Sequence, residues 1–360
     1  MTYTPNDIQE MGTLVLRSSN VKNGEIVDAD NVYVNDKVAT SENVQVGDII
    51  VVVRNGSRAL IGKHAQIKAS MPNTVIGAFM SGIRSGQSSF VNALLDTSAF
   101  ENEIAKNMGA TINQITGYMF SKMEFMVPSE EEQQQIGQYF SNLDHLITLH
   151  QRKCDETKKL KKFMLQKMFP KKDEKKPEIR FAGFTDDWEQ RKLGEVFQEY
   201  SEKNHPELPA LTIIQGGGTV LREKSERKLQ YDKSSLAWYK MVREDDFIVH
   251  LRSFEGGLEK SNHNGLISPA YHTFHGDEVD SRFYYPYFRS YEFIKHKLVP
   301  HVYGIRDGRS IDIDGMKTIE IPWTSYEEQK KIGDYIESLD TLITLHRRAY
   351  YNEKGELTNV

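Results

Sequence analysis

Apolar residues recur at steps of four and three along two stretches of the chain, residues 129–152 and 325–348. The first stretch reads SEEEQQQIGQYFSNLDHLITLHQR and the second reads SYEEQKKIGDYIESLDTLITLHRR. Fifteen of the 24 aligned positions are identical, without gaps and at a constant offset of 196 residues. A match of this length indicates a tandem duplication. The pattern predicts a chain that alternates domain, long helix, domain and long helix.

The apolar positions place one seam along each predicted helix. A repeat of steps of four and three is a heptad, which is typical of coiled-coil packing. An ordinary amphipathic bundle helix also fits stretches this short. The positions expected to face the other helix or a partner are Ile136, Phe140, Leu143, Ile147 and His150 in the first copy, and Ile332, Ile336, Leu339, Ile343 and His346 in the second.

Both helices begin with the same start signal. Ser129 precedes Glu132 by three residues, and Ser325 precedes Glu328 in the same way. This spacing predicts a capping box, in which the serine hydroxyl accepts from the third helical amide and the glutamate reaches back to the serine amide. The first helix is expected to run to about Met168, so that about forty residues form a rod of about 60 Å.

The segments between the helices carry short apolar runs separated by turn residues. Residues 12–17, 48–54 and 75–80 read as strands, and residues 88–108 have apolar residues at helical spacing. The run VQVGDIIVVVR at 44–54 matches VREDDFIVHLR at 242–252, so the second domain repeats the first in diverged form. The expected parts are a mixed α/β domain at 1–127, a central helix and linker at 128–178, a second α/β domain at 179–323 and a distal helix at 324–360.

The two copies differ at their ends. The second domain opens with IRFAGFTDDWEQRKLGEVF from Ile179, and the same opening shifted by 196 residues falls before Met1. The last helix ends in KGELTNV where the first copy continues through KKLKKFMLQKMF. We therefore expect the first domain to lack its own start and the distal helix to be shortened.

Composition narrows the class of protein. A formal net charge of -5 argues against a chain that is basic overall, so any nucleic-acid contact has to come from local patches. The only cysteine is Cys154, which excludes a disulfide framework. The N-terminus lacks the features of a signal peptide, and no apolar run approaches the roughly 18 residues of a membrane span. A cytoplasmic protein without a membrane partner is expected.

A search for catalytic chemistry finds no site. The chain has neither an Asn/Asp-Pro-Pro-aromatic loop for amino-methylation nor a G-x-G-x-x-G cofactor loop. Residues 215–219, QGGGT, lack the Lys-Ser/Thr of a phosphate loop, and they read as a loop or a close backbone approach. No Cys or carboxylate set joins His263, His272 and His275, which favours polar surface over metal. Cys154 lies at a heptad position, so core packing is preferred over a nucleophile.

What remains is binding chemistry in loops that follow strands. Arginine suits guanine, asparagine and glutamine suit adenine, and serine, threonine and lysine suit phosphates. Ordinary surface turns have a similar composition, so the loops alone leave DNA binding open. The candidate DNA-binding residues are Arg17, Ser19, Asn20, Arg54, Asn55, Arg58, Lys63, Thr111, Asn113 and Gln114 in the first domain, and Gln215, Arg252, Ser253, Lys260, Asn262, Tyr303, Arg306, Arg309 and Ser310 in the second.

The repeated helix closely resembles one family. The run EEQ-x-x-IG-x-Y/F-x-x-LD-x-LITLHQRK, then LKKFMLQKMF and IRFAGFTDDWEQRKLGEVF, resembles the specificity subunits of type I restriction–modification enzymes over nearly the whole chain. GATINQIT and GIRDGRSID also look like the loop that faces DNA in that family.

The resemblance implies a fold and a set of partners. The fold is α+β, with two target-recognition domains alternating with two long helices that pack as an antiparallel coiled coil with pseudo-twofold symmetry. Each domain reads one half of a bipartite asymmetric site in double-stranded DNA, and the helices set the spacing. The expected partners are two methyltransferase (M) subunits and restriction (R) subunits, which hold S-adenosylmethionine, ATP and Mg. The chain itself binds no cofactor and is not an enzyme.

A second hypothesis belongs to another class of protein. With shortened ends, the chain could be a coiled-coil scaffold or decoy that binds methyltransferase subunits without competent DNA recognition. DNA binding by the assembled complex discriminates between the two hypotheses.

Overall fold

The chain divides into two compact units. The computed structural model describes residues 1–108, 113–171, 173–225, 233–250, 257–304 and 310–358. Unit 1 comprises Met1–Gln151 and Arg347–Val360, and unit 2 comprises Arg152–His346. Both boundaries fall inside the long helices, so each helix contributes to both units. No helix in the described ranges is long and apolar enough to cross a membrane.

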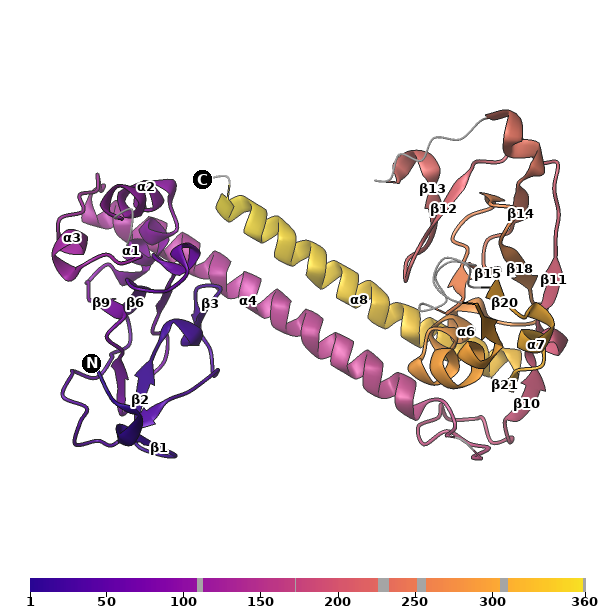
Figure 1. Ribbon diagram of the computed structural model, residues 1–360, viewed down its shortest axis with the longest axis horizontal. Helices are drawn as coiled ribbons and strands as arrows, with labels where there is room; N and C mark the ends of the chain where they lie inside the picture. Colours follow the sequence, from indigo (N-terminus) through magenta and orange to yellow (C-terminus); the bar gives the residue numbers. More distant parts are fainter. Residues whose placement is uncertain (109–112, 172, 226–232, 251–256, 305–309, 359–360) are drawn as a thin grey trace. The chain divides into compact units, whose positions relative to one another are not determined.

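The two predicted long helices are present. Helix α4 spans Glu130–Lys167 with 38 residues, and helix α8 spans Tyr326–Thr358 with 33 residues (Figure 1). At 1.5 Å per residue they are about 57 and about 50 Å long. Each begins one residue after the predicted serine. The hydroxyls of Ser129 and Ser325 lie 3.4 Å from the amides of Glu132 and Glu328, which confirms the serine half of each cap.

The other half of the predicted capping box is wrong at Glu328. Its carboxylate does not reach back to the Ser325 amide. It accepts instead from Arg180 Nε at 2.6 Å, from Arg180 Nη2 at 2.8 Å, from Trp188 Nε1 at 3.1 Å and from the Thr324 hydroxyl. The side chain is 1% exposed. A guanidinium fork satisfies a buried carboxylate better than one backbone amide does, because it supplies charge as well as two donors.

Within unit 2 the two helices run antiparallel. Cys154 Sγ lies 3.8 Å from the carbonyl oxygen of Ile343, and Lys161 Nζ lies 2.5 Å from Asp340 Oδ1. Further along α4, Met164, Leu165 and Met168 share a core cluster with Ile332 and Ile336. Residue numbers rise along α4 as they fall along α8, which confirms the predicted antiparallel packing in this unit (Figure 1).

Burial follows the predicted seam in both helices. Leu143, Ile332, Ile336 and Leu339 are buried, together with Cys154. The remaining seam positions are half-buried, and these are Ile136, Phe140, Ile147, His150, Ile343 and His346. Apolar residues off the seam, such as Leu146 and Leu342, are exposed. Two of the seam residues, Ile332 and Ile336, also pack against the second domain, so this part of the seam anchors a domain as well as a helix.

The domain of unit 1 is built around strand β6 (Ile49–Val52), which is buried on both faces. Ile49 and Val51 face helices α1, α2 and the segment after them, whereas Ile50 and Val52 face the cluster around Leu16. This alternation follows from the two-residue period of a strand. The sheets have the orders β1-β5-β2-β8, β7-β6-β9 and β3-β4. The other strands are β1 (Ile8–Gln9), β2 (Thr13–Leu16), β3 (Val21–Lys22), β4 (Glu25–Ile26), β5 (Tyr33–Val34), β7 (His64–Gln66), β8 (Thr74–Ile76) and β9 (Met80–Ile83).

Two predicted elements of unit 1 are split in the structure. The helical segment at 88–108 forms α1 (Ser88–Leu95) and α2 (Ser98–Asn107), because Thr97 caps a new helix and its hydroxyl lies 3.4 Å from the Phe100 amide. The strand predicted at 75–80 ends in β8 and resumes in β9, with a turn at 77–79 between them. A third short helix, α3 (Gly117–Ser121), precedes α4.

The domain of unit 2 repeats this plan. Strand β15 (Phe247–Val249) lies between β16 (Glu259–Lys260) and β18 (His272–His275), just as β6 lies between β7 and β9. A parallel bridge joins Ala210 to Leu266, as β2 pairs parallel with β8. The other elements are β10 (Glu189–Lys192), α5 (Leu193–Val196), β11 (Gln198–Tyr200), β12 (Leu211–Ile214), β13 (Gly218–Leu221), β14 (Lys240–Val242), β17 (Gly265–Ile267), α6 (Ser281–Phe288), the π-helix η7 (Phe293–Leu298), β19 (Val302–Tyr303), β20 (Ser310–Ile311), α7 (Ile313–Lys317) and β21 (Glu320–Trp323).

A glycine at the same repeat position docks each long helix on its own domain. A Cβ at Gly137 would lie 2.7 Å from the Phe90 amide nitrogen of α1, and a Cβ at Gly333 would lie 2.9 Å from Asp280 Oδ1 at the cap of α6. Only glycine allows this approach, which explains the Ile-Gly pair in both copies of the repeat. The docking sets each domain against its own stretch of helix.

Candidate nucleic-acid interface

Three loops of unit 1 that carry predicted DNA-binding residues converge in the structure. Asn55 Nδ2 donates to Ser18 Oγ at 3.0 Å, which joins the loop after β6 to the loop after β2. Asn113 Nδ2 donates to the Gly56 carbonyl at 3.0 Å, and Arg54 forms an isolated bridge with Gln114. Residues far apart in the sequence therefore form one surface at the end of β6.

A fourth segment, the turn at 77–79, completes this surface. The Gly77 amide donates to the Leu16 carbonyl at 2.9 Å, and the Phe79 carbonyl accepts from the amides of Val53 at 3.0 Å and Arg54 at 3.2 Å. The Arg54 guanidinium lies over the Phe79 ring, with Cζ 4.9 Å from the centroid. Sequence reasoning missed Phe79 because residues 75–80 read as one strand. The Gly77 just before it was the available signal of a turn.

The predicted residues of unit 1 differ in exposure. Arg54 and Arg58 are exposed, and Arg17, Ser19, Asn55, Lys63, Asn113 and Gln114 are half-buried. Thr111 lies outside the described residues. The surface therefore presents two exposed guanidinium groups beside amide side chains, the types that read guanine and adenine.

Asn20 was expected to bind DNA, but its side chain is buried inside its own loop. It is 0% exposed. Its Oδ1 accepts from the Arg17 amide at 2.9 Å, and its Nδ2 donates to the Ala29 carbonyl at 2.7 Å and to Asn31 Oδ1 at 2.9 Å. Asn20 therefore shapes the loop, and it does not present its amide to solvent.

The counterpart loops of unit 2 are described in part. Arg252, Ser253, Arg306 and Arg309 lie outside the described residues. Lys260 pairs with Asp245 at 2.5 Å, and Asn262 Nδ2 donates to the Gly217 carbonyl at 2.8 Å. Gln215 and Tyr303 are exposed, and Tyr303 pairs with Ser310 in the β19–β20 ladder. These two strands flank the segment that carries Arg306.

The glycine-rich loop at 215–218 encloses a carboxylate of the chain itself. The amides of Gly216 and Gly218 donate to Glu259 at 2.8 and 3.3 Å, and the Tyr285 hydroxyl donates to it at 2.8 Å. Arg289 pairs with the same group, which is 4% exposed. A Cβ at Gly218 would lie 2.5 Å from the Lys260 carbonyl, which confirms a close backbone approach. The amides of Gly216 and Gly218 therefore already donate to a side chain of the chain itself.

Two of the three histidines that could have suggested a metal, His272 and His275, are held in separate pairs. His272 Nδ1 lies 2.7 Å from Glu199, and His275 Nδ1 lies 2.5 Å from Asp246. Across the described ranges, no three His, Cys, Asp or Glu side chains are grouped so as to hold a metal ion.

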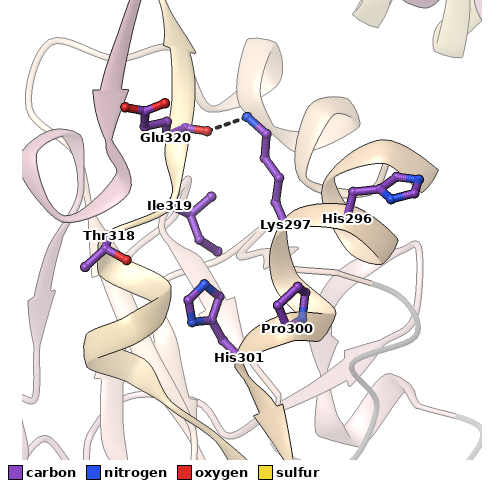
Figure 2. Close-up of a pocket in the computed structure, with 7 residues that line it drawn as sticks. All are labelled: His296, Lys297, Pro300, His301, Thr318, Ile319 and Glu320. Atoms are coloured by element: carbon purple, nitrogen blue, oxygen red, sulfur yellow. Dashed lines mark hydrogen bonds between the residues drawn. The ribbon is translucent and has the colours of Figure 1, made fainter. Parts of the chain in front are cut away.

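A shallow pocket of about 420 Å³ lies between the π-helix and β21 in unit 2. Figure 2 shows the seven residues that line it, which are His296, Lys297, Pro300, His301, Thr318, Ile319 and Glu320. The Lys297 ammonium donates to the Glu320 carbonyl at 2.5 Å, and burial lowers its pKa. The Thr318 hydroxyl donates to the Gly315 carbonyl at 2.6 Å, so it is not held as a nucleophile against either imidazole.

Comparison with known proteins finds similar sequences of one kind. Residues 4–159 match the model of the type I restriction modification DNA specificity domain. The type I restriction enzyme MjaVIII specificity subunit of Methanocaldococcus jannaschii is 26% identical over 265 residues, which are 68% of this chain and 61% of that protein. The EcoKI specificity subunit of Escherichia coli is 27% identical over 134 residues, which are 36% of this chain and 29% of that protein.

A solved structure extends the likeness to the whole fold. The S subunit of a type I restriction–modification system from M. genitalium matches with a TM-score of 0.62 and 14% identity, over 99% of this chain and 90% of that one. The chain spans about three fifths of the length of the first curated relative, 61%. The repeated helix and the paired α/β domains agree with these matches: residues 4–159 resemble the type I restriction modification DNA specificity domain, and the chain as a whole has the fold of a solved S subunit.

Proposed function

We propose that this chain is the DNA-reading subunit of a type I restriction–modification complex, and that each domain reads one half of a bipartite asymmetric site. The convergence of the three predicted loops of unit 1 carries the proposal. Loops placed together at the end of a buried strand form a rigid platform, and this platform presents arginine and amide side chains. Such side chains recognise base edges in the major groove.

Each domain contributes its own side chains. In unit 1, Arg54 and Arg58 contact guanine or phosphate, and the half-buried amides of Asn113 and Gln114 lie beside them. In unit 2, Arg252 and Arg306 have the corresponding role. The exposed Gln215 follows β12, and the exposed Tyr303 precedes Arg306 in the sequence. Because the two domains have diverged in these loops, the two half-sites differ in sequence.

The long helices set the spacing between the half-sites and dock two methyltransferase subunits. Support comes from the glycine docking of a domain on each helix and from the exposed apolar side chains Leu146, Leu160, Phe163, Leu342 and Leu345. Restriction subunits complete the complex. S-adenosylmethionine, ATP and Mg belong to these partners, and this chain contributes recognition without catalysis.

Mapping of methylated adenines tests the proposal. The chain is expressed with its cognate methyltransferase subunits in cells that lack other adenine methylation, and the genome is sequenced for N6-methyladenine. A split motif with two defined halves and an undefined gap is expected. Absence of any motif that depends on this chain would contradict the proposal. A stable complex without DNA binding would instead favour the alternative of a scaffold or decoy.

A further inference from the structure

We propose that Phe79 is a specificity-determining residue, and that its ring contacts the 5-methyl group of a thymine in the half-site read by unit 1. The inference deepens the proposed function and rests on it. Apolar side chains distinguish thymine in the major groove through this methyl group, which no other base carries there.

The ring lies beside one of the converging loops, the loop that begins at Arg54. Phe79 is 51% exposed although it is a large aromatic residue. Its carbonyl binds the amides of Val53 and Arg54, and the turn that carries it is bonded to Leu16, the residue before Arg17. The exposed ring is therefore flanked by the loops that carry the candidate arginines.

The turn at 77–79 is held rigidly. A Cβ at Gly77 would lie 3.2 Å from the Leu16 carbonyl oxygen and 3.7 Å from Arg17 Cγ, so the turn packs closely against the end of β2. Bonds from Gly77, Val53 and Arg54 fix it from both sides. A ring on a fixed backbone loses little conformational entropy on binding, since it has only two side-chain torsions.

The Arg54 guanidinium gives the ring a defined neighbour. Its Cζ lies 4.9 Å from the ring centroid, a distance typical of a cation–π contact. This spacing lies between one and two times the rise of about 3.4 Å between base pairs in B-form DNA. Arg54 and Phe79 can therefore contact the same or adjacent base pairs, one through hydrogen bonds and the other through the methyl group.

The corresponding place in unit 2 shows what sets Phe79 apart. There the ring of Tyr271, just before β18, lies tilted against His250 with centroids 4.5 Å apart, and its hydroxyl lies 2.9 Å from His250 Nε2. Tyr271 is half-buried and packs against a core cluster. Both domains thus keep an aromatic ring on a basic side chain after the central strand, but unit 1 leaves its ring open to solvent.

An exposed apolar residue is not by itself a site, because single ones are common on protein surfaces. Val46 provides a matched comparison, since it is 61% exposed in the same unit. It precedes β6, whereas Arg54 and the turn of Phe79 lie at the other end of that strand. Val46 therefore stands about 13 Å or more from the converging loops along the strand.

Thymine-to-uracil substitution tests the contact, because uracil lacks only the 5-methyl group. The complete complex with its methyltransferase subunits is titrated with oligonucleotides carrying the mapped site, with each thymine of the unit 1 half replaced in turn. At one position we expect the wild-type affinity to fall about fourfold, the value of one buried methyl group. Phe79→Ala should weaken binding to the thymine site by at least as much and lose the response to uracil, and Phe79→Leu should retain part of it.

Each other outcome has a defined meaning. Val46→Ala should keep both the affinity and the uracil response of the wild type. If Phe79→Ala binds DNA and keeps the full uracil response, or if no thymine in that half gives a response, the contact is wrong while the proposed function stands. If the wild-type complex binds no specific DNA, the proposed function itself fails.

Discussion

The two copies of the repeated helix start share their sequence but anchor their domains differently. In unit 2, Glu328 is 1% exposed and ties the start of α8 to Arg180 and Trp188. The strand that follows Trp188, β10, pairs with β21 just before α8. In unit 1, the corresponding Glu132 is exposed, and residues 123–129 before α4 form no strand.

One sequence motif therefore anchors its domain in two different ways. Both copies keep the serine cap and the docking glycine, and Gln133 and Gln329 both donate to the carbonyl five residues earlier, at 2.9 and 2.7 Å. Among the described residues, only those of unit 2 add a buried ion pair to this shared frame. The hydrophobic cores of the two units also differ. The main cluster of unit 2 is rich in phenylalanine, whereas the clusters around β6 in unit 1 are mostly aliphatic.

The largest expected effect comes from Glu328→Ala. The substitution leaves the Arg180 charge largely buried without its carboxylate, which costs about 3–5 kcal/mol of unfolding free energy. Glu132→Ala is the matched control and should change stability by less than about 0.5 kcal/mol. All 3 tryptophans, Trp188, Trp238 and Trp323, lie in unit 2. Urea unfolding is therefore followed by tryptophan fluorescence for unit 2 and by circular dichroism for the whole chain. Equal effects of the two substitutions on the circular dichroism transition would contradict this comparison.

Substitution of the docking glycines, Gly137 and Gly333, should change the unfolding free energy by a smaller amount. Here the larger loss is expected in unit 1. In an open helix, Gly→Ala is stabilising by about 1 kcal/mol. At Gly137 the added Cβ would meet backbone of α1 at 2.7 Å, and at Gly333 it would meet the Asp280 side chain at 2.9 Å. Overpacking costs about 1–3 kcal/mol, and a side chain yields more readily than backbone. Gly137→Ala should destabilise more than Gly333→Ala, as measured by circular dichroism and fluorescence together.

The smallest expected effect is the pH dependence of the stability of unit 1, which comes from the pair of His64 and Asp96. Burial by itself lowers the pKa of the His64 imidazole, but the hydrogen bond and charge of Asp96 overcome it and raise the pKa above 6.5. A raised pKa means that folding favours the protonated form. The stabilisation is therefore fully present below pH 6.5 and is lost as pH rises through the folded pKa.

The circular dichroism transition of unit 1 tests this between pH 6 and 8. Because Asp96 is 63% exposed, the loss should stay below about 1 kcal/mol. Asp96→Asn should remove the dependence. A slope of the same size in the tryptophan signal of unit 2 would show that another group is responsible.

Sequence reasoning was most successful where long-range periodicity carries the information. The seam of α4 and α8 was readable because identical apolar steps occur twice, and a helix depends chiefly on residues three and four apart. The end of α4 at Lys167 agrees with the prediction of about Met168. The loops that follow β2 and β6 were also recognisable from their arginine, serine and asparagine residues.

Sequence reasoning failed where one side chain decides between two local structures. Thr97 caps a new helix inside an otherwise continuous apolar pattern, and the turn at 77–79 interrupts a run of strand-forming residues. Glu328 has the spacing of a capping box, but Arg180, 148 residues away in sequence, determines where its carboxylate points. Such tertiary partners leave no trace in a local pattern.

We propose that each domain reads its own half of the DNA site. The most direct measurement maps methylated adenines for the complex with Arg54→Ala and Arg58→Ala, and separately with Arg252→Ala and Arg306→Ala. Each good base contact contributes about 1–3 kcal/mol of discrimination, so each pair should relax one half of the motif and leave the other intact. If either pair changes both halves together, the assignment of one half-site to each domain is wrong.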